Sequence, residues 1–125
     1  MIRGMGTDMV DIARIGRAME RHGERFALRI LSAAEYRIFV AKGCPPAWLA
    51  KRFAAKEAAS KALGTGIGAV SWHDIEIAND TRGAPCLAFH GGGARRLAEI
   101  GACRAWLSLS DEAGLALAFV VLEGE

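Results

Sequence analysis

The sequence lacks most of the features that mark a zinc module, an exported protein or a membrane protein. It holds three cysteines and three histidines in 125 residues, and none of them stand at the spacing of a zinc site. No run reaches the ~20 apolar residues that cross a bilayer, and the N-terminal MIRGMGTDMVD has no apolar stretch of the signal-peptide kind. We therefore expect a cytoplasmic protein whose free cysteines pack as small apolar side chains.

Strong charge of one sign is also missing. The net charge is +2, and no long basic run is interleaved with aromatic residues, so neither nucleic acid nor a membrane surface is an expected partner. Hydrophobic residues make up 52% of the chain and charged residues 24%, which is an ordinary globular mix. A chain of this length buries roughly two-thirds of its unfolded surface, so we expect one domain over residues 1–125.

The pattern of apolar residues predicts an α+β protein, because helical segments and antiparallel strands are separated along the chain. A capping box of Ser32 and Glu35 opens one helix, and Gly23 and Gly64 end two others. The predicted helices cover residues 12–23, 24–31, 33–42, 46–63 and 94–101, the predicted strands cover 2–12, 71–77, 84–90, 104–110 and 115–123, and the predicted loops include 43–46 and 91–94. The last two strands, separated by DEAG, predict a hairpin.

The first strand carries an acid where a core residue is expected. Met5 and Met9 lie on one parity and Val10 on the other, so we predict burial on both faces. Asp8 shares the parity of Val10, and a buried carboxylate needs a partner. Gly6 lies inside this strand, where glycine weakens pairing.

The helix over residues 46–63 holds a second acid, Glu57, one turn before Lys61 and among alanines. One interpretation is an exposed i,i+4 pair worth about 0.2–0.5 kcal/mol. The other places Glu57 near Asp8 as a pair of magnesium ligands, because Mg²⁺ takes one or two carboxylates and completes its shell with water and phosphate oxygens. Lys61 would then act as a point charge on a phosphate, and the glycines after the helix would let the backbone approach a ligand.

These motifs resemble a known family. GTDMVDIARI at 6–15 and KRFAAKEAASKALGTGIG at 51–68 are similar to the holo-acyl-carrier-protein synthases, the short single-module form of the 4′-phosphopantetheinyl transferases. The resemblance implies an antiparallel sheet packed against a long helix and shorter helices, and a homotrimer with active sites between subunits. It also implies magnesium-dependent transfer of the 4′-phosphopantetheine group of coenzyme A to a serine of apo acyl carrier protein, with release of adenosine 3′,5′-bisphosphate, as in fatty acid biosynthesis. Two alternatives stay open: a non-catalytic carrier-binding module of the same fold, and another magnesium phosphotransferase.

The resemblance also implies roles for individual residues. Magnesium ligands are expected at Asp8 and Glu57, which form the catalytic set together with Lys61. The expected coenzyme A contacts are Arg52, Phe53, Lys61, Gly64, Thr65, Gly66, Arg82 and Pro85. The expected acyl carrier protein contacts are Arg14, Arg21, Arg25, Phe26 and Arg29. The proton of the attacking serine passes either to Glu57 or to a metal-bound water that Glu57 orients.

The expected carrier contacts have a physical rationale. Arg14, Arg17 and Arg21 are spaced three and four residues apart and therefore share one helix face. Acyl carrier proteins are small and acidic, so a basic face would steer them toward the site. The alternative interpretation is an ordinary solvated helix face.

One residue departs from the family pattern. Trp106 stands two residues before Ser108, where the family often carries a histidine. We expect Trp106 to pack against its neighbours, so the departure puts a histidine general base in doubt. Asp111 is expected to serve the turn of the C-terminal hairpin, and the alternative is that it faces the site.

Overall fold

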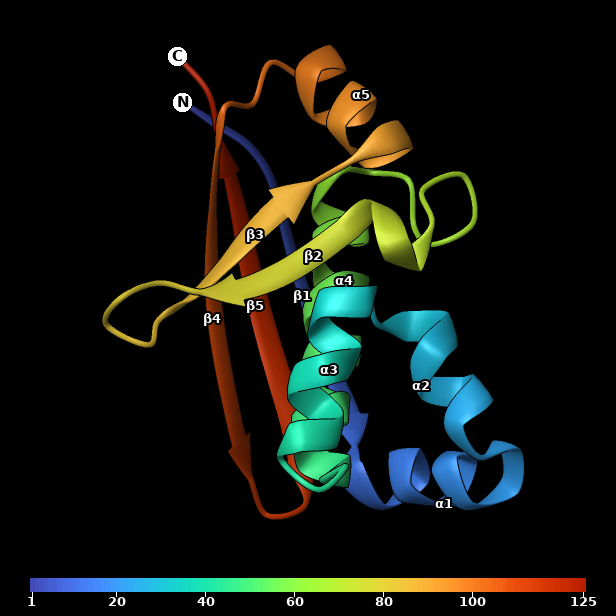
Figure 1. The fold of residues 1–125 in the computed structure, drawn as a ribbon. Helices are drawn as coiled ribbons and strands as arrows, with labels where there is room; N and C mark the ends of the chain where they lie inside the picture. Colours follow the sequence, from blue (N-terminus) through green and yellow to red (C-terminus); the bar gives the residue numbers. More distant parts are fainter.

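The structure, a computed structural model that describes residues 1–125, has the predicted α+β architecture (Figure 1). Three strands pair antiparallel in the order β1-β5-β4, and β2 and β3 form a separate antiparallel pair. The helices and strands, in chain order, are β1 (Ile2–Asp11), α1 (Ile12–His22), α2 (Glu24–Ile30), α3 (Ala33–Ala41), α4 (Pro46–Ala62), the 3₁₀ helix η1 (Trp72–Asp74), β2 (Ile75–Asn79), β3 (Pro85–Phe89), α5 (Gly91–Glu99), β4 (Arg104–Glu112) and β5 (Leu115–Glu123). No helix is long and apolar enough to span a bilayer.

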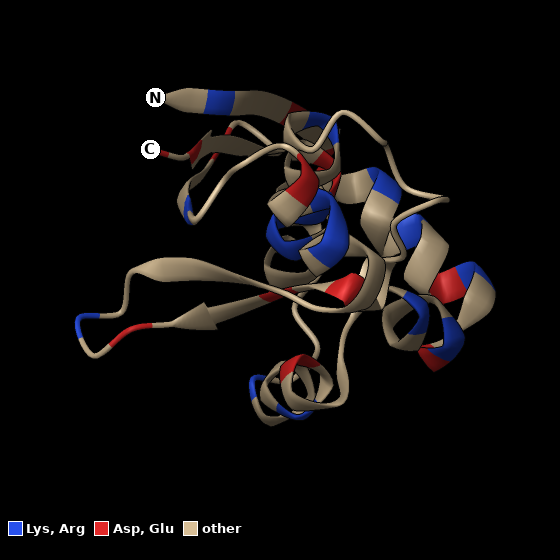
Figure 2. Ribbon diagram, turned by 90° about the horizontal axis from the view of Figure 1, so that it is seen from above, with Lys and Arg blue, Asp and Glu red and all other residues tan.

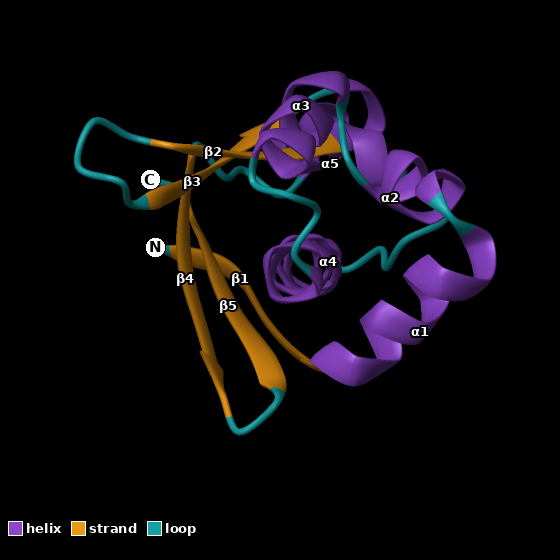
Figure 3. Ribbon diagram, turned by 60° about the horizontal axis from the view of Figure 1, so that its bottom comes forward, coloured by secondary structure: helices purple, strands orange, loops and turns teal.

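Helix α4 is the centre of the fold. It begins with Pro46 in its first turn, where a missing N–H costs nothing, and it ends before Gly64, which has a positive φ of 77°. Figure 3 looks along α4, which lies between the three-stranded sheet and helices α1–α3. Most of its residues are buried, and many of these are alanines that let both layers come close. The helix can therefore present side chains to the sheet on one side and to the other helices on the opposite side.

Glycines in β1 allow the strand to lie directly on α4. A Cβ atom at Gly4 would overlap the carbonyl oxygen of Ala62, and one at Gly6 would overlap that of Ala58. Gly6 was expected only to weaken the strand. The structure gives both glycines a packing role, because no larger residue fits between β1 and the helix backbone.

The prediction that β1 is buried on both faces is wrong. Val10 is buried, but Met5 and Met9 are each 59% exposed. The reason is that α4 covers only one face of the three-stranded sheet, as Figure 3 shows, and no element of the chain covers the other. The bare face carries further large apolar side chains, namely Trp106, Leu115, Leu117 and Phe119.

Three further predictions also fail. Residues 91–94 were predicted to be a loop but form the first turn of α5, because glycine lets this turn approach Asp74: a Cβ at Gly91 would lie 2.8 Å from the Asp74 Oδ1 atom. The predicted strand over 71–77 begins only at Ile75, since the residues before it form η1. All three cysteines are exposed and are not packed in the core.

Candidate active site

The two acids predicted to lie together come from β1 and α4, and Lys61 joins them. The Lys61 ammonium lies 3.1 Å from Asp8 Oδ1 and donates to the Thr7 carbonyl oxygen at 3.0 Å. Lys61 therefore forms its ion pair across elements with Asp8, and the exposed i,i+4 pair with Glu57 does not form. Asp8, on the strand parity that faces α4, is partly buried, with 17% of its side chain exposed. Parity alone was enough to predict this placement.

Glu57 lies within electrostatic reach of Asp8. Burial raises the pKa of the Glu57 carboxyl, the negative charge of Asp8 raises it further, and the Lys61 ammonium opposes both effects. No hydrogen-bond donor of the chain reaches the Glu57 carboxylate. Two carboxylates with a single lysine nearby form a site that favours an added cation.

The carboxylates of Asp8 and Glu57 fit a magnesium ion whose remaining ligands come from water and from the phosphates of a substrate. No group of three or more His, Cys, Asp or Glu side chains is gathered anywhere in the chain, which argues against an all-protein metal cage. Mg²⁺ keeps several waters and needs only one or two carboxylates when substrate phosphates supply the rest. Two carboxylates from different elements, of which Glu57 has no donor from the chain, favour a cation here. The direction of the Glu57 pKa, which burial and Asp8 raise, agrees with this.

The glycine turn follows directly from the helix that carries Glu57. Gly64 and Gly66 have φ angles of 77° and 69°, which are accessible to glycine at little cost. The N–H groups of Thr65 and Gly66 both donate to the Ser60 carbonyl oxygen at 3.1 Å. The turn is thus anchored on the last turns of α4, beside the two charged residues.

A second group of the expected coenzyme A contacts, Arg52 and Pro85, lies at a separate hollow. Arg52 is 4% exposed, its guanidinium stacks 4.4 Å above the Trp48 ring, and its Nη2 donates to Asn79 Oδ1 at 3.2 Å. Its Nε has no hydrogen-bond partner, and burial lowers its pKa. Arg52 faces a hollow of about 310 Å³ that is lined by Lys42, Trp48, Lys51, Arg52, Asn79, Pro85 and Leu109. A buried guanidinium with an unused N–H and two neighbouring lysines suits an anion.

The structure does not bring all expected coenzyme A contacts together. Asp8 and Lys61 line a different hollow, of about 520 Å³, with Thr7, Met9 and Leu117. Phe53 packs on Trp72, with ring centroids 5.0 Å apart, and lines neither hollow. Arg82 lies in the turn between β2 and β3, which projects from the body of the molecule in Figure 1. Within one chain the expected residues therefore form at least two separate groups.

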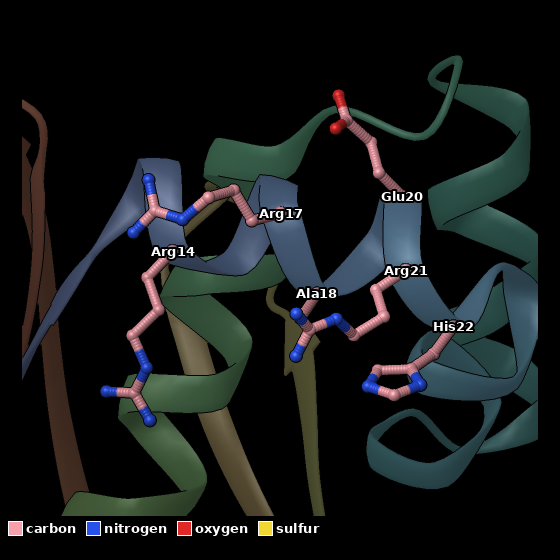
Figure 4. A pocket seen from close by; sticks show the side chains of 6 residues that line it. All are labelled: Arg14, Arg17, Ala18, Glu20, Arg21 and His22. Carbon is pink, nitrogen blue, oxygen red and sulfur yellow. The ribbon is translucent and has the colours of Figure 1, made fainter.

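The arginines of α1 and α2 form a continuous exposed surface, which we call the arginine face: Arg14, Arg17, Arg21, Arg25 and Arg29. Basic segments recur along these helices in Figure 2. In Figure 4, Arg14 and Arg21 extend to one side of α1 and Glu20 points the other way. Two hollows, of about 620 and 380 Å³, meet at Arg21 and His22, and Phe26 lines the second. The expected carrier contacts thus share one surface.

Sequence reasoning missed a buried ion pair between α4 and α3. Lys56, next to Glu57, is fully buried and lies 2.7 Å from Glu35 Oε1. Glu35 was identified only as the capping-box acid; it accepts from Ser32 N as predicted and also from Ile77 N at 2.9 Å. A lysine amid small apolar residues on a central helix was the available signal. Asp111 was expected to serve a turn, but it lies in β4 and pairs with Lys51 at 3.2 Å.

Comparison with known proteins matches nearly the whole chain. The family model described as the 4′-phosphopantetheinyl transferase superfamily matches residues 4–120. A holo-[acyl-carrier-protein] synthase of Halorhodospira halophila is 55% identical over 123 residues, which cover 98% of both chains. The crystal structure of a holo-[acyl-carrier-protein] synthase from Neisseria meningitidis has a TM-score of 0.91 at 48% identity and covers 98% of this chain and 99% of its own. The Helicobacter pylori synthase in complex with coenzyme A has a TM-score of 0.83 at 34% identity over 95% of this chain and 99% of its own.

Proposed function

The chain belongs to the 4′-phosphopantetheinyl transferase superfamily, and from that premise we propose that it transfers the 4′-phosphopantetheine group of coenzyme A to a serine of apo acyl carrier protein. Adenosine 3′,5′-bisphosphate is the second product. The observation that carries the proposal is the convergence of Asp8, Glu57 and Lys61 beside the glycine turn. A carrier modified in this way would serve fatty acid biosynthesis.

The proposed chemistry is phosphoryl transfer, which depends mostly on positioning and on neutralising charge. The serine hydroxyl attacks the phosphorus next to pantetheine, a new P–O bond forms, and the bond to the bisphosphate breaks. The serine proton passes to Glu57 or to a water that Glu57 orients. Lys61 balances charge on the leaving bisphosphate. Magnesium held by Asp8 and Glu57 would supply additional positive charge to the pyrophosphate oxygens.

We further propose that the working form is a homotrimer whose active sites lie between subunits. The expected coenzyme A contacts of one chain fall in two groups, around Lys61 and around Arg52. One coenzyme A molecule could contact both groups of residues if each group came from a different, neighbouring subunit. The bare face of the sheet, with Met5, Met9 and Phe119 exposed, supplies apolar surface for such an interface.

The direct test is a mass measurement on the carrier. Purified chain is incubated with coenzyme A, Mg²⁺ and apo acyl carrier protein, and the carrier is weighed by mass spectrometry. The proposal expects a carrier heavier by one phosphopantetheine arm in the complete mixture, and a carrier of unchanged mass when Mg²⁺ is removed by a chelator. An unmodified carrier in the complete mixture would overturn the proposal and favour a binding module or a different phosphotransferase.

The arginine face is the proposed docking surface for the acidic carrier. We expect Arg14→Glu to raise KM for the carrier about tenfold or more, because a charge reversal adds repulsion to a lost attraction, and to leave KM for coenzyme A unchanged. The rate at low carrier concentration should also fall with salt, since screening acts over roughly 8–10 Å. Steady-state kinetics at two ionic strengths checks both points. Equal changes in both KM values would show that Arg14 acts structurally.

A further inference from the structure

The end of α4 is held by a residue from a distant helix. Leu63 caps the helix, and its carbonyl oxygen accepts a hydrogen bond from Arg96 Nε at 2.8 Å, across 33 positions of the sequence. Arg96 comes from α5, which packs mainly against η1 and β3 and otherwise stands apart at the top of Figure 1. Its Nη1 also lies 3.3 Å from Glu99 on the same helix.

No backbone N–H donates to the Leu63 carbonyl oxygen, so Arg96 is its hydrogen-bond donor. Gly64 N donates to Lys61 O, and Thr65 N and Gly66 N both donate to Ser60 O. Leu63 is 1% exposed, so water has little access to its backbone. The guanidinium also complements the partial negative charge at a helix C-terminus.

Arg96 reaches the glycine turn as well as the helix end. A Cβ atom at Gly64 would lie 3.5 Å from Arg96 Nη2, so the guanidinium packs along the first residue of the turn. The turn is tied to Ser60, and the Ser60 hydroxyl donates to the Glu57 carbonyl oxygen at 2.7 Å. One side chain of α5 therefore braces the segment between Glu57 and Gly66.

We propose that Arg96 is a positioning residue for coenzyme A binding, which it supports by holding residues 64–66 in their binding conformation. The inference rests on the proposed function and adds a residue that neither the motifs nor the resemblance indicated. A turn that is already ordered loses less conformational freedom when it binds a ligand. A chain in which only a fraction of molecules has the ordered turn binds more weakly by that fraction.

The test compares Arg96→Ala with Arg95→Ala. Arg95 is the matched control, because it is an exposed arginine on the same helix without an ion pair or a bond to the turn. We expect Arg96→Ala to raise KM for coenzyme A about tenfold, in line with the loss of one charge-assisted hydrogen bond, and to leave kcat and KM for the carrier within about twofold. Amide hydrogen exchange at Thr65 and Gly66, measured without ligand, should become faster.

The outcomes separate the two proposals. An unchanged KM for coenzyme A together with unchanged exchange at Thr65 and Gly66 overturns the role of Arg96, and so does an equal rise in KM for Arg95→Ala, which would indicate bulk charge. A fall in kcat with unchanged KM also counts against it. If the unsubstituted chain transfers nothing, the proposed function fails, and the exchange measurement still decides whether Arg96 orders the turn.

Discussion

Two lysines on α4 pair with carboxylates from other elements, and their surroundings are opposite. Lys56 and Glu35 are 0% and 1% exposed and lie 2.7 Å apart, whereas Lys61 and Asp8 are 51% and 17% exposed and lie 3.1 Å apart. An ammonium group has three N–H donors. Lys56 uses all three, on Glu35 and on the carbonyl oxygens of Ile30 and Trp72.

The exposed pair leaves capacity for a ligand. Lys61 donates to Asp8 and to the Thr7 carbonyl oxygen, which leaves one N–H directed to solvent. Glu35 accepts from Ser32 N, Ile77 N and Lys56, while the Glu57 carboxylate has no donor from the chain. Burial and complete hydrogen bonding therefore distinguish the structural pair from the pair available for chemistry, although both consist of a carboxylate and a lysine of α4.

The difference between the two lysine–carboxylate pairs is tested most directly by replacing the buried lysine. We expect Lys56→Met to lower the free energy of unfolding by about 3–5 kcal/mol, because Glu35 is left buried without its cation. The matched control is Lys61→Met, the same change in the exposed pair, for which the expected loss is at most about 1 kcal/mol. Urea denaturation at pH 7 measures both.

Equal losses for the two variants would show that burial does not separate the pairs. A second variant, Lys56→Met with Glu35→Gln, removes both charges but keeps an acceptor oxygen for the backbone donors that Glu35 serves. It should be more stable than Lys56→Met alone, because no buried carboxylate remains unpaired. A double variant that is less stable by the sum of both changes would contradict the ion-pair explanation.

The next largest effect is expected on catalysis. Glu57→Gln should lower the rate of transfer at least about 100-fold, since even outer partners of a metal site cost ~10–100-fold. The free energy of unfolding without divalent cation should not fall, because the raised pKa means that ionised Glu57 destabilises the folded chain. Carrier mass and urea denaturation in a chelator give the two readings. Full activity would remove Glu57 from the site and favour the binding-module alternative.

Lys61→Met is expected to have a smaller effect on activity. The variant loses one charge-assisted bond to the phosphate that leaves, so kcat/KM for coenzyme A should fall about tenfold. Stability should change little, since the Lys61 side chain is half exposed. Steady-state kinetics with varied coenzyme A checks this. A loss of stability as large as that of Lys56→Met would place Lys61 with the structural pair.

The features of this molecule that follow from local signals were predictable, and those that depend on distant contacts were not. The capping box at Ser32, the glycine end of α4 and the C-terminal hairpin are each encoded within a few residues. The alternation of residues along β1 was enough to predict that Asp8 lies on the face that packs against the core. Lys56 and Glu35 are separated by 21 positions, and nothing in helical periodicity connects them.

The wrong predictions have the same physical origin. Alternation in β1 indicates two apolar faces but does not say whether the chain covers both, and Met5 and Met9 are exposed because it covers only one. Glycines at 91–93 disfavour a helix on propensity alone, and their approach to Asp74 overrides that preference. The split of the expected coenzyme A contacts between Arg52 and Lys61 has no local signal at all.

The smallest effect concerns a carboxylate of intermediate exposure beside the buried pair. The side chain of Glu76 is 26% exposed and accepts from the Ser32 hydroxyl at 2.6 Å. That hydrogen bond is the main cause of the lowered pKa of Glu76, and His90, 3.2 Å away, contributes as well. Burial acts in the opposite direction. Glu76 therefore stabilises the fold most when it is ionised.

Its pH dependence has a definite sign. Because the folded pKa lies below the ordinary value of 4.5, the stability from Glu76 is present above that value and is lost as the pH falls through the folded pKa. We expect Glu76→Gln to be less stable than the unsubstituted chain by about 0.5–1.5 kcal/mol at pH 7, and we expect this difference to shrink below about pH 4. Urea denaturation of both chains across that range measures it. A difference that stays constant with pH would mean that Glu76 acts through packing alone, and that the charge of this partly buried carboxylate contributes nothing to stability.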